Sequence, residues 1–287
     1  MNRKLHPLLI FPFCFLLFLS CRKNNPDTGA GNNTSLTLLN VPYGTDPQQQ
    51  MDIYLPAGRD STTRIMILIH GGGWNSGDKT DFNAYVDSLK RREPSYAIFN
   101  LNYRLATGTA YFFPTQENDV KAAVDFILAK SADYQVSKKL VLVGASAGAH
   151  LALLQAYKYN TNSPVRAVVD FFGPTELADM YANPPNPLVP LLLASVTGGS
   201  PASNPDIYFS SSPVHFISAT SCPTLIFHGG ADIVVSPTQS VMLSDQLQAA
   251  AVPHEYFFYP SEGHGWEGSN LSDSFDKIAA FLSLHVH

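Results

Sequence analysis

The sequence of 287 residues contains three cysteines, and their positions leave no pair for an intrachain disulfide. Cys14 and Cys21 lie in an N-terminal stretch that has the pattern of a targeting signal, so only Cys222 remains in the rest of the chain. Cys222 comes just before a predicted strand, and no cysteine-protease signature surrounds it. We expect a buried structural thiol there, because free cysteine packs as a small apolar side chain.

The sequence also has fewer basic than acidic residues. Lysine and arginine number 18 against 23 aspartate and glutamate, which gives a formal net charge of −5. Such a chain has no basic surface to attract a polyanion, so we expect no nucleic-acid partner. The sequence also has no P-loop, no HExxH, no CxxC and no internal repeat. Its 45% hydrophobic content is enough for one large globular domain or two small ones.

No apolar run at the N-terminus is long enough to span a bilayer. The run from Leu8 to Leu19 is short, contains Pro12 and follows two basic residues, so residues 1–21 are predicted to be an export signal. Its end, LFLSC, resembles a bacterial lipobox, in which Cys21 becomes the lipid-bearing first residue. We expect an exported, lipid-anchored bacterial protein; ordinary secretion and an uncleaved anchor are the alternatives. Residues 22–35 are polar and rich in Gly and Asn, which predicts a flexible tether.

From residue 36 onward the pattern is that of an α/β protein. Apolar or alternating runs predict eight strands, at 36–41, 51–55, 64–70, 96–101, 139–143, 165–171, 223–228 and 254–259. Helical patterns lie near 79–92, 116–131, 146–159, 236–251 and 271–284. This order predicts an α/β-hydrolase-like domain over 36–287, with a mostly parallel eight-stranded sheet, an antiparallel start and helices on both faces. The Pro/Ser/Asn-rich segment 175–220 interrupts the alternation and is interpreted as a small cap or lid.

The sequence KLVLVGASAGAHLA, residues 139–152, places a G-x-S-x-G pattern between a buried strand and a helix. In a nucleophile elbow of this kind, the serine sits in a strained turn above the edge of the sheet. A chance G-x-S-x-G occurs in roughly one chain in ten of this length, so the motif alone is weak. Its setting between strand and helix makes Ser146 the candidate nucleophile.

Two later residues complete a triad in the chain order Ser, Asp, His. His264 lies in the Gly-flanked loop SEGHGW after the last predicted strand, and Asp232 lies in FHGGAD after the strand before it. The Asp232 carboxylate would accept Nδ1–H of His264 and leave Nε2 to face Ser146. A solvated loop histidine is the alternative for His264 if it is considered alone.

A glycine run supplies the fourth piece. His70 is followed by GGGW directly after a strand, which lets backbone N–H groups approach a substrate. We expect the amides of Gly72, Gly73 and Ala147 to form an oxyanion hole, and His70 to orient the loop. Trp74 is predicted to contact substrate. Together with the aromatic run 111–113 it would crowd the acyl side of the pocket, unless these rings are core residues.

The set HGGGW, NYRLA, GASAGAH, HGGAD and GHGW resembles the α/β-hydrolase esterases, over residue 36 to the end. Within them it is most similar to the branch related to hormone-sensitive lipase and to the bifunctional feruloyl and acetyl-xylan esterases of gut bacteria. The stretch ATG at 106–108 departs from the Ala-Pro-Glu usual in the hormone-sensitive-lipase group. The resemblance implies a serine carboxylesterase that needs no metal or organic cofactor. Its expected substrates are short acyl esters, including acetyl or feruloyl groups on plant polysaccharide.

Two other functions remain open from the sequence. A serine peptidase of the prolyl-oligopeptidase type shares this catalytic domain. A non-catalytic carbohydrate-binding lipoprotein could retain the same fold. Neither the acyl group, the alcohol nor the oligomeric state follows from the motifs.

Overall fold

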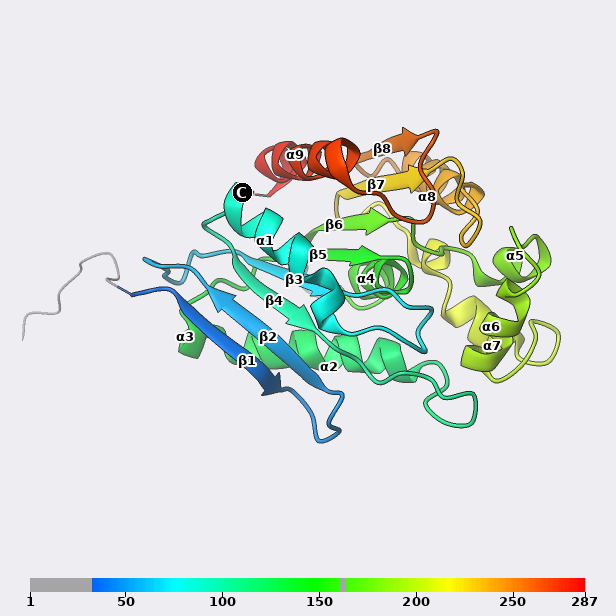
Figure 1. Cartoon of the computed structure of the whole chain (residues 1–287), viewed down its shortest axis with the longest axis horizontal. Helices are drawn as coiled ribbons and strands as arrows, with labels where there is room; N and C mark the ends of the chain where they lie inside the picture. The colour runs from blue at the N-terminus through cyan, green and yellow to red at the C-terminus, as the bar shows by residue number, and fades with distance from the viewer. Residues whose placement is uncertain (1–32, 161–163, 287) are drawn as a thin grey trace, which may run out of the picture. The chain divides into compact units, whose positions relative to one another are not determined.

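The protein is built on one eight-stranded sheet in the order β1-β2-β4-β3-β5-β6-β7-β8 (Figure 1). A computed structural model describes residues 33–160 and 164–286, and within them the strands are β1 (Leu36–Pro42), β2 (Gln50–Leu55), β3 (Ile65–Ile69), β4 (Ala97–Leu101), β5 (Leu140–Ala145), β6 (Val165–Phe171), β7 (Thr224–Gly229) and β8 (His254–Tyr259). β2 is antiparallel to β1 and β4, and the remaining pairs are parallel. The predicted fold class is confirmed, including the antiparallel start.

Helices connect the parallel strands. The longer ones are α1 (Asn83–Arg92), α2 (Thr115–Ala129), α4 (Ala147–Tyr157), α8 (Thr238–Ala249) and α9 (Gly268–His285). The shorter ones are η1 (Lys79–Phe82), α3 (Ser131–Tyr134), α5 (Leu177–Ala182), α6 (Val189–Thr197), α7 (Pro205–Ser210) and η2 (Pro213–Phe216). All five helical patterns expected from the sequence are present, although two of them divide into a short and a long helix.

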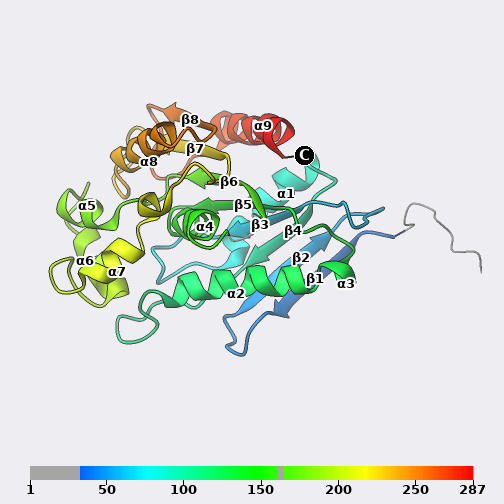
Figure 2. The same cartoon turned by 180° about the vertical axis from the view of Figure 1, so that it is seen from behind.

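Two hydrophobic cores lie on opposite faces of the sheet, because successive side chains of a strand point to opposite sides. In β3, Ile65, Ile67 and Ile69 pack in the core beneath α2, α4 and α8, whereas Met66 and Leu68 pack in the core beneath α1 and α9. Figures 1 and 2 show these two helical layers from the two sides. The central strands β3, β4 and β5 are buried throughout, which explains their continuous apolar sequences.

The predicted cap segment contains the short helices α5, α6, α7 and η2, grouped beyond the carboxyl ends of the parallel strands (Figure 1). Its apolar patch, residues 188–196, forms most of α6, which begins with a proline in its first turn and ends at Gly198 in a left-handed conformation. Leu193 and Val196 face the core, while Leu188 and Leu191 are exposed. Within the cap, α6 therefore packs with one side toward the core and leaves the other side exposed.

The predicted signal segment 1–21, with Cys21, lies outside the described residues, as does most of the predicted tether 22–35. Within the part of the chain that is described, no helix combines the length and the apolarity needed to cross a membrane. Cys222 is buried just before β7, and burial raises the pKa of its thiol to about 12, as suits a structural side chain.

Candidate active site

Ser146 occupies the sharp turn between β5 and α4. Its backbone has φ 55° and ψ −123°, a combination that costs energy for any residue with a Cβ. The turn is held by a 2.8 Å hydrogen bond from the Ser146 amide to the carbonyl of Phe171 on β6. Glycine is required on either side, since a Cβ on Gly144 would lie 2.4 Å from the carbonyl carbon of Gly148, and a Cβ on Gly148 would lie 2.0 Å from the carbonyl oxygen of Ile69.

The structure brings together the three residues predicted as a triad. His264, in the loop between β8 and α9, has Nε2 2.8 Å from Oγ of Ser146 and Nδ1 2.7 Å from Oδ2 of Asp232. Because a carboxylate only accepts, Nδ1–H of His264 donates to Asp232, which leaves Nε2 to accept the Ser146 hydroxyl proton. The ring of His264 also packs against Phe172 at a centroid distance of 4.7 Å. This arrangement can activate a hydroxyl as a nucleophile.

Asp232 is held in place by backbone as well as by histidine. Its Oδ1 accepts hydrogen bonds from the amides of Val234 at 2.8 Å and Val235 at 3.0 Å, in the turn that follows β7. Burial would raise the pKa of this carboxyl group. Hydrogen bonds from His228, His264 and the Val235 amide outweigh it and keep the pKa well below its usual range. Asp232 is therefore ionised beside His264.

His228, at the start of the HGGAD motif, is a part of the site that the sequence analysis did not assign. Its Nε2 lies 3.3 Å from Oδ2 of Asp232 and 3.0 Å from the carbonyl oxygen of Val235, and its Nδ1 lies 2.7 Å from the Ser240 hydroxyl. Both neighbours of Nε2 are acceptors, so Nε2 carries the proton and Nδ1 accepts from Ser240. The motif itself was the signal, since this histidine lies four residues before Asp232 on a buried strand.

The glycine loop after β3 passes directly beside Ser146. A Cβ on Gly71 would lie 3.3 Å from Cβ of Ser146, and Gly72 and Gly73 both have positive φ, 104° and 59°. Within residues 33–160 and 164–286, the amides of Gly72, Gly73 and Ala147 donate no hydrogen bond. The loop and the first turn of α4 thus present free N–H groups next to the Ser146 hydroxyl, an arrangement that can stabilise an oxyanion.

His70 supports this loop from below. Its ring stacks on Tyr103 with a centroid distance of 4.4 Å and 9° between the planes, and its Nδ1 lies 2.7 Å from the carbonyl oxygen of Gly71. Burial lowers the pKa of His70, so the ring is neutral and Nδ1–H donates to Gly71. The Tyr103 hydroxyl donates to the carbonyl of His70 at 3.1 Å. Both side chains orient the glycine loop, and within residues 33–160 and 164–286 neither forms a hydrogen bond with Ser146.

Trp74 closes the glycine loop, but its side chain is only 1% exposed. Its indole N–H donates to Nδ1 of His150 at 3.2 Å, and its ring meets Phe113 edge to face. His150 in turn has Nε2 2.6 Å from the carbonyl of Ser211 in the cap. Burial lowers the pKa of His150 to about 4, which keeps it neutral. Trp74 borders the cavity chiefly as a buried wall, and a direct contact with substrate stays a prediction.

A cavity of about 480 Å³ opens at Ser146 and His264. Its polar side contains the glycine loop, and its other walls are formed mainly by Phe172, Pro174, Met180, Leu192, Val234 and Val235. The expectation that the aromatic run 111–113 crowds this cavity is wrong, because none of those residues lines it. Phe113 belongs to the core, and the loop carries Tyr111 to the surface. Among the described residues, no group of three or more His, Cys, Asp or Glu side chains could hold a metal ion.

Comparisons with known proteins agree with this geometry. The chain is 25% identical over 266 residues to esterase LipC of Mycobacterium tuberculosis, an alignment that covers 86% of this chain and 64% of LipC. Its fold matches a bifunctional GH43-CE protein of Bacteroides eggerthii with a TM-score of 0.75 and 27% identity, over 86% of this chain and 35% of that one. It also matches a truncated carbohydrate esterase from gut microbiota, with a TM-score of 0.70 and 25% identity, over 88% of this chain and 99% of that one.

The chain spans from half to about two thirds of the length of the first curated relatives that it matches. Two of these relatives are named esterases and the third a probable carboxylic ester hydrolase, in agreement with the enzyme class expected from the sequence. The model of the BD-FAE family matches residues 51–247, which include the glycine loop, Ser146 and Asp232. With its eight-stranded α/β-hydrolase fold, the chain belongs to the BD-FAE family.

Proposed function

We propose that the protein is a serine carboxylesterase that acts through an acyl-enzyme. The observation that carries this proposal is the pair of hydrogen bonds that joins Ser146 to His264 (2.8 Å) and His264 to Asp232 (2.7 Å). Beside them lie glycine-loop amides that donate no hydrogen bond to any described residue. Names of relatives add support, since several are esterases.

In the first half of the reaction, Oγ of Ser146 attacks the ester carbonyl carbon while Nε2 of His264 takes the hydroxyl proton. The carbonyl oxygen becomes negative in the tetrahedral intermediate and accepts hydrogen bonds from Gly72, Gly73 and Ala147. Loss of one such donor costs on the order of 3 kcal/mol of transition-state stabilisation. The bond to the alcohol then breaks, and the alcohol leaves with the proton from His264.

In the second half, water attacks the acyl carbon and His264 again takes and returns the proton, which frees the acid and restores Ser146. Asp232 stays ionised throughout and stabilises the imidazolium of His264, because its own pKa lies well below the usual range. Besides the ester and water, these steps use only Ser146, His264, Asp232 and the amides of the oxyanion hole.

For the substrate, we propose a short acyl ester such as an acetyl or feruloyl ester of a plant polysaccharide. The cavity of about 480 Å³ is walled on one side by apolar residues from the cap and from the turn after β7, which suits an acyl group. One structural neighbour is named a carbohydrate esterase from gut microbiota, which supports a saccharide as the alcohol. We further propose export and lipid attachment at Cys21, on the strength of the N-terminal pattern.

The test compares the wild type with Ser146→Ala and with Ser269→Ala, an exposed serine on α9 that serves as the matched control. Substrates are 4-nitrophenyl esters from acetyl to octanoyl, acetylated xylan, methyl ferulate and a dipeptidyl anilide, with labelling by a fluorophosphonate as a second readout. We expect hydrolysis of short esters and labelling in the wild type and control, and neither in Ser146→Ala. Activity that survives in a folded Ser146→Ala variant would refute the mechanism. Cleavage of the anilide in place of the esters would favour a peptidase, and absence of labelling a binding protein.

A further inference from the structure

A second hollow adjoins the catalytic cavity. It has a volume of about 580 Å³ and is lined by Gln48, Asn75, Leu105, Thr107, Tyr111 and Ser195, together with backbone of the same loops. Asn75, next to Trp74 at the end of the glycine loop, lines both this hollow and the catalytic cavity. The alcohol part of an ester whose carbonyl group lies at Ser146 can therefore extend from the catalytic cavity past Asn75 into this hollow.

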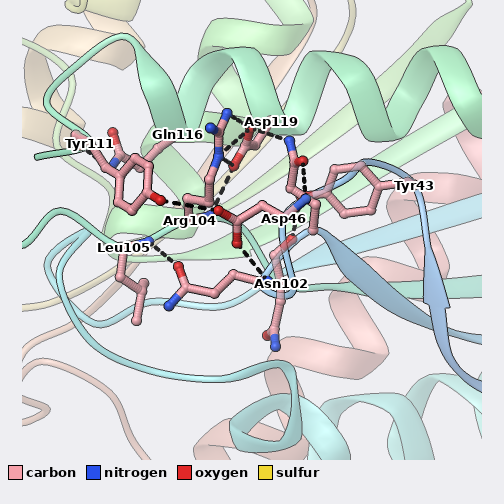
Figure 3. Close-up of polar contacts among 10 residues, drawn as sticks. Tyr43, Asp46, Asn102, Arg104, Leu105, Tyr111, Gln116 and Asp119 are labelled. Carbon is pink, nitrogen blue, oxygen red and sulfur yellow. Dashed lines mark hydrogen bonds and ion pairs between the residues drawn. The ribbon is translucent and has the colours of Figure 1, made fainter.

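The side chains of the hollow are held by a hydrogen-bond network. The Tyr111 hydroxyl donates to Oδ2 of Asp46 at 3.1 Å, and the Tyr111 ring lies against the Arg104 guanidinium, 5.3 Å from the ring centroid (Figure 3). Gln116 Nε2 donates to the carbonyl of Tyr111 at 2.7 Å. The Tyr111 ring is fixed at its hydroxyl, at one face and at its backbone, although it is 38% exposed.

The network rests on Asp119, whose side chain is 1% exposed on α2. Its carboxylate accepts hydrogen bonds from both the side chain and the backbone amide of Arg104, and from Nε2 of Gln49 at 2.7 Å. Figure 3 shows how these residues connect the loop before β2, the loop after β4 and helix α2. The hollow is therefore a preformed surface, and its side chains lose little freedom when a ligand binds.

Two side-chain amides in the hollow have donor or acceptor groups that make no hydrogen bond to a described residue. Oε1 of Gln48 accepts the amide of Leu105 at 2.9 Å, which orients the side chain and leaves its NH₂ group without a partner among the described residues. The side chain of Asn75 likewise makes no hydrogen bond within residues 33–160 and 164–286. Both side chains are exposed to solvent. They offer donors and acceptors to a ligand at no cost to the fold.

The chemistry of this surface selects a neutral polyhydroxylated ligand. Its lining side chains include two amides, two hydroxyls, a tyrosine ring and Leu105, and none of them carries a charge. An acyl chain would gain more from the apolar walls of the catalytic cavity than from this polar hollow. A sugar ring presents hydroxyls for the amides and an apolar C–H face for the tyrosine.

We propose that this hollow binds a pyranose ring of the alcohol part of the ester, with Tyr111 and Gln48 as specificity-determining residues. The inference rests on the proposed esterase function and adds the alcohol subsite to it. The scissile ester lies at Ser146, the acyl group lies against the apolar walls, and the saccharide chain passes Asn75 toward Tyr111. The hollow then explains how one enzyme distinguishes a sugar ester from a simple alkyl or aryl ester.

The test uses three variants in the full chain. Tyr111→Ala removes the ring, and Tyr111→Phe keeps the ring but loses the bond to Asp46. Gln48→Glu keeps an oxygen for the Leu105 amide and replaces the NH₂ donor with an anionic oxygen. Gln248→Glu, an exposed change on α8, is the control for added charge. Each protein is assayed for kcat/KM on acetylated xylotetraose and on 4-nitrophenyl acetate, and for inhibition of the aryl ester by xylotetraose.

We compare kcat/KM for the sugar ester with kcat/KM for the aryl ester. We expect this ratio to fall about tenfold in Tyr111→Ala and in Gln48→Glu, because one hydrogen bond or ring contact contributes about that factor. Tyr111→Phe and the control should keep the wild-type ratio to within about threefold. Xylotetraose should inhibit the wild type and lose potency in the same two variants. An unchanged ratio in both variants, or no inhibition by xylotetraose, overturns the subsite while aryl-ester hydrolysis still supports the esterase. If the wild type hydrolyses neither the sugar ester nor the aryl ester, the proposed function is overturned instead.

Discussion

His150 gives a prediction in which the effect of a substitution changes with pH. This buried residue on α4 joins the indole N–H of Trp74 in the glycine loop to the carbonyl of Ser211 in the cap, through contacts of 3.2 and 2.6 Å. The substitution His150→Leu introduces an apolar side chain of related size and leaves the Trp74 donor and the Ser211 acceptor buried without a partner. Each such group costs about 1–3 kcal/mol, so we expect the free energy of unfolding near pH 7 to fall by about 3 kcal/mol.

The same free energy should depend on pH in the wild type. Burial lowers the pKa of His150 from 6.5 to about 4, so between these values the unfolded chain binds a proton that the folded chain does not. The free energy of unfolding therefore decreases as the pH falls from 6.5 to about 4. The loss attributable to His150 reaches about 2 kcal/mol at pH 5 and about 3 kcal/mol once the pH is below 4. His150→Leu has no group to protonate, so the gap between the two proteins should close to about 1 kcal/mol at pH 5.

The assay is urea unfolding of both proteins across this pH range, followed by tryptophan fluorescence. Only the difference between them is informative, because other groups titrate in both. Asp170 is one example, since burial raises the pKa of its carboxyl to about 7. A gap between the two proteins that stays constant from pH 7 to pH 5 would show that His150 is not the buried neutral bridge described above. A variant as stable as the wild type at pH 7 would contradict the two hydrogen bonds.

Three further predictions concern the triad, the elbow and the N-terminus. Asp232→Asn should lower kcat on a short ester by about 10⁴-fold, because the tautomer of His264 is no longer fixed; a decrease of less than tenfold in steady-state assays would contradict that role. Gly148→Ala should abolish activity and destabilise the fold, because the new Cβ would lie 2.0 Å from the carbonyl oxygen of Ile69. A Cβ on Gly108 would have no atom within 4 Å, so Gly108→Ala should lower the free energy of unfolding, measured by thermal unfolding, by only about 1 kcal/mol. Equal effects would refute the steric argument. Cys21→Ser should move the protein from the membrane fraction to the soluble fraction with its rate on a soluble ester unchanged, and retention in the membrane fraction would place the anchor elsewhere.

The residues that sequence reasoning located share one property, a local pattern that implies geometry. The continuous apolar run before Ser146 predicts a buried parallel strand, and the small residues around it predict the turn, so the position of Ser146 follows from its neighbours. Asp232 and His264 follow because the carboxyl ends of parallel strands meet at one edge of the sheet. The structure places His264 within hydrogen-bonding distance of both Ser146 and Asp232, as that reasoning requires.

What sequence reasoning missed depends on contacts between distant segments. His150 and His228 lie inside recognised motifs, yet their partners Trp74, Ser211 and Ser240 are defined only by the packed structure. The aromatic run 111–113 looked uniform in sequence. In the fold, Phe113 enters the core, whereas Arg104 and Asp46 hold Tyr111 at the surface. No periodicity distinguishes these outcomes.

The cap was predicted as a segment but not as helices, because α5 and α7 are too short to be stable alone. Tertiary hydrogen bonds hold them. Gln239 on α8 accepts the amides of Thr175 and Glu176 at 2.9 and 2.8 Å, and the Ser212 hydroxyl accepts the amide of Leu177 at 2.9 Å. The hydrogen bonds to Gln239 and Ser212 are buried or partly buried. Detaching the start of the cap would leave several buried polar groups without a partner, at a cost of about 1–3 kcal/mol for each group.

The same bonds bear on how the site selects an acyl group. The cap contributes Met180 and Leu192 to the wall of the catalytic cavity, and its two ends are held at Gln239 and, through Ser211, at His150. We expect a wall attached at these two points to change little in shape when a substrate binds. Acyl length is then limited by the volume between this wall and Ser146, so enlarging the wall side chains should exclude longer chains, each excluded methylene costing about 1–3 kcal/mol in discrimination. We therefore expect the cap side chains to contribute to specificity for the acyl group, and the hollow beyond Asn75 to contribute to specificity for the alcohol.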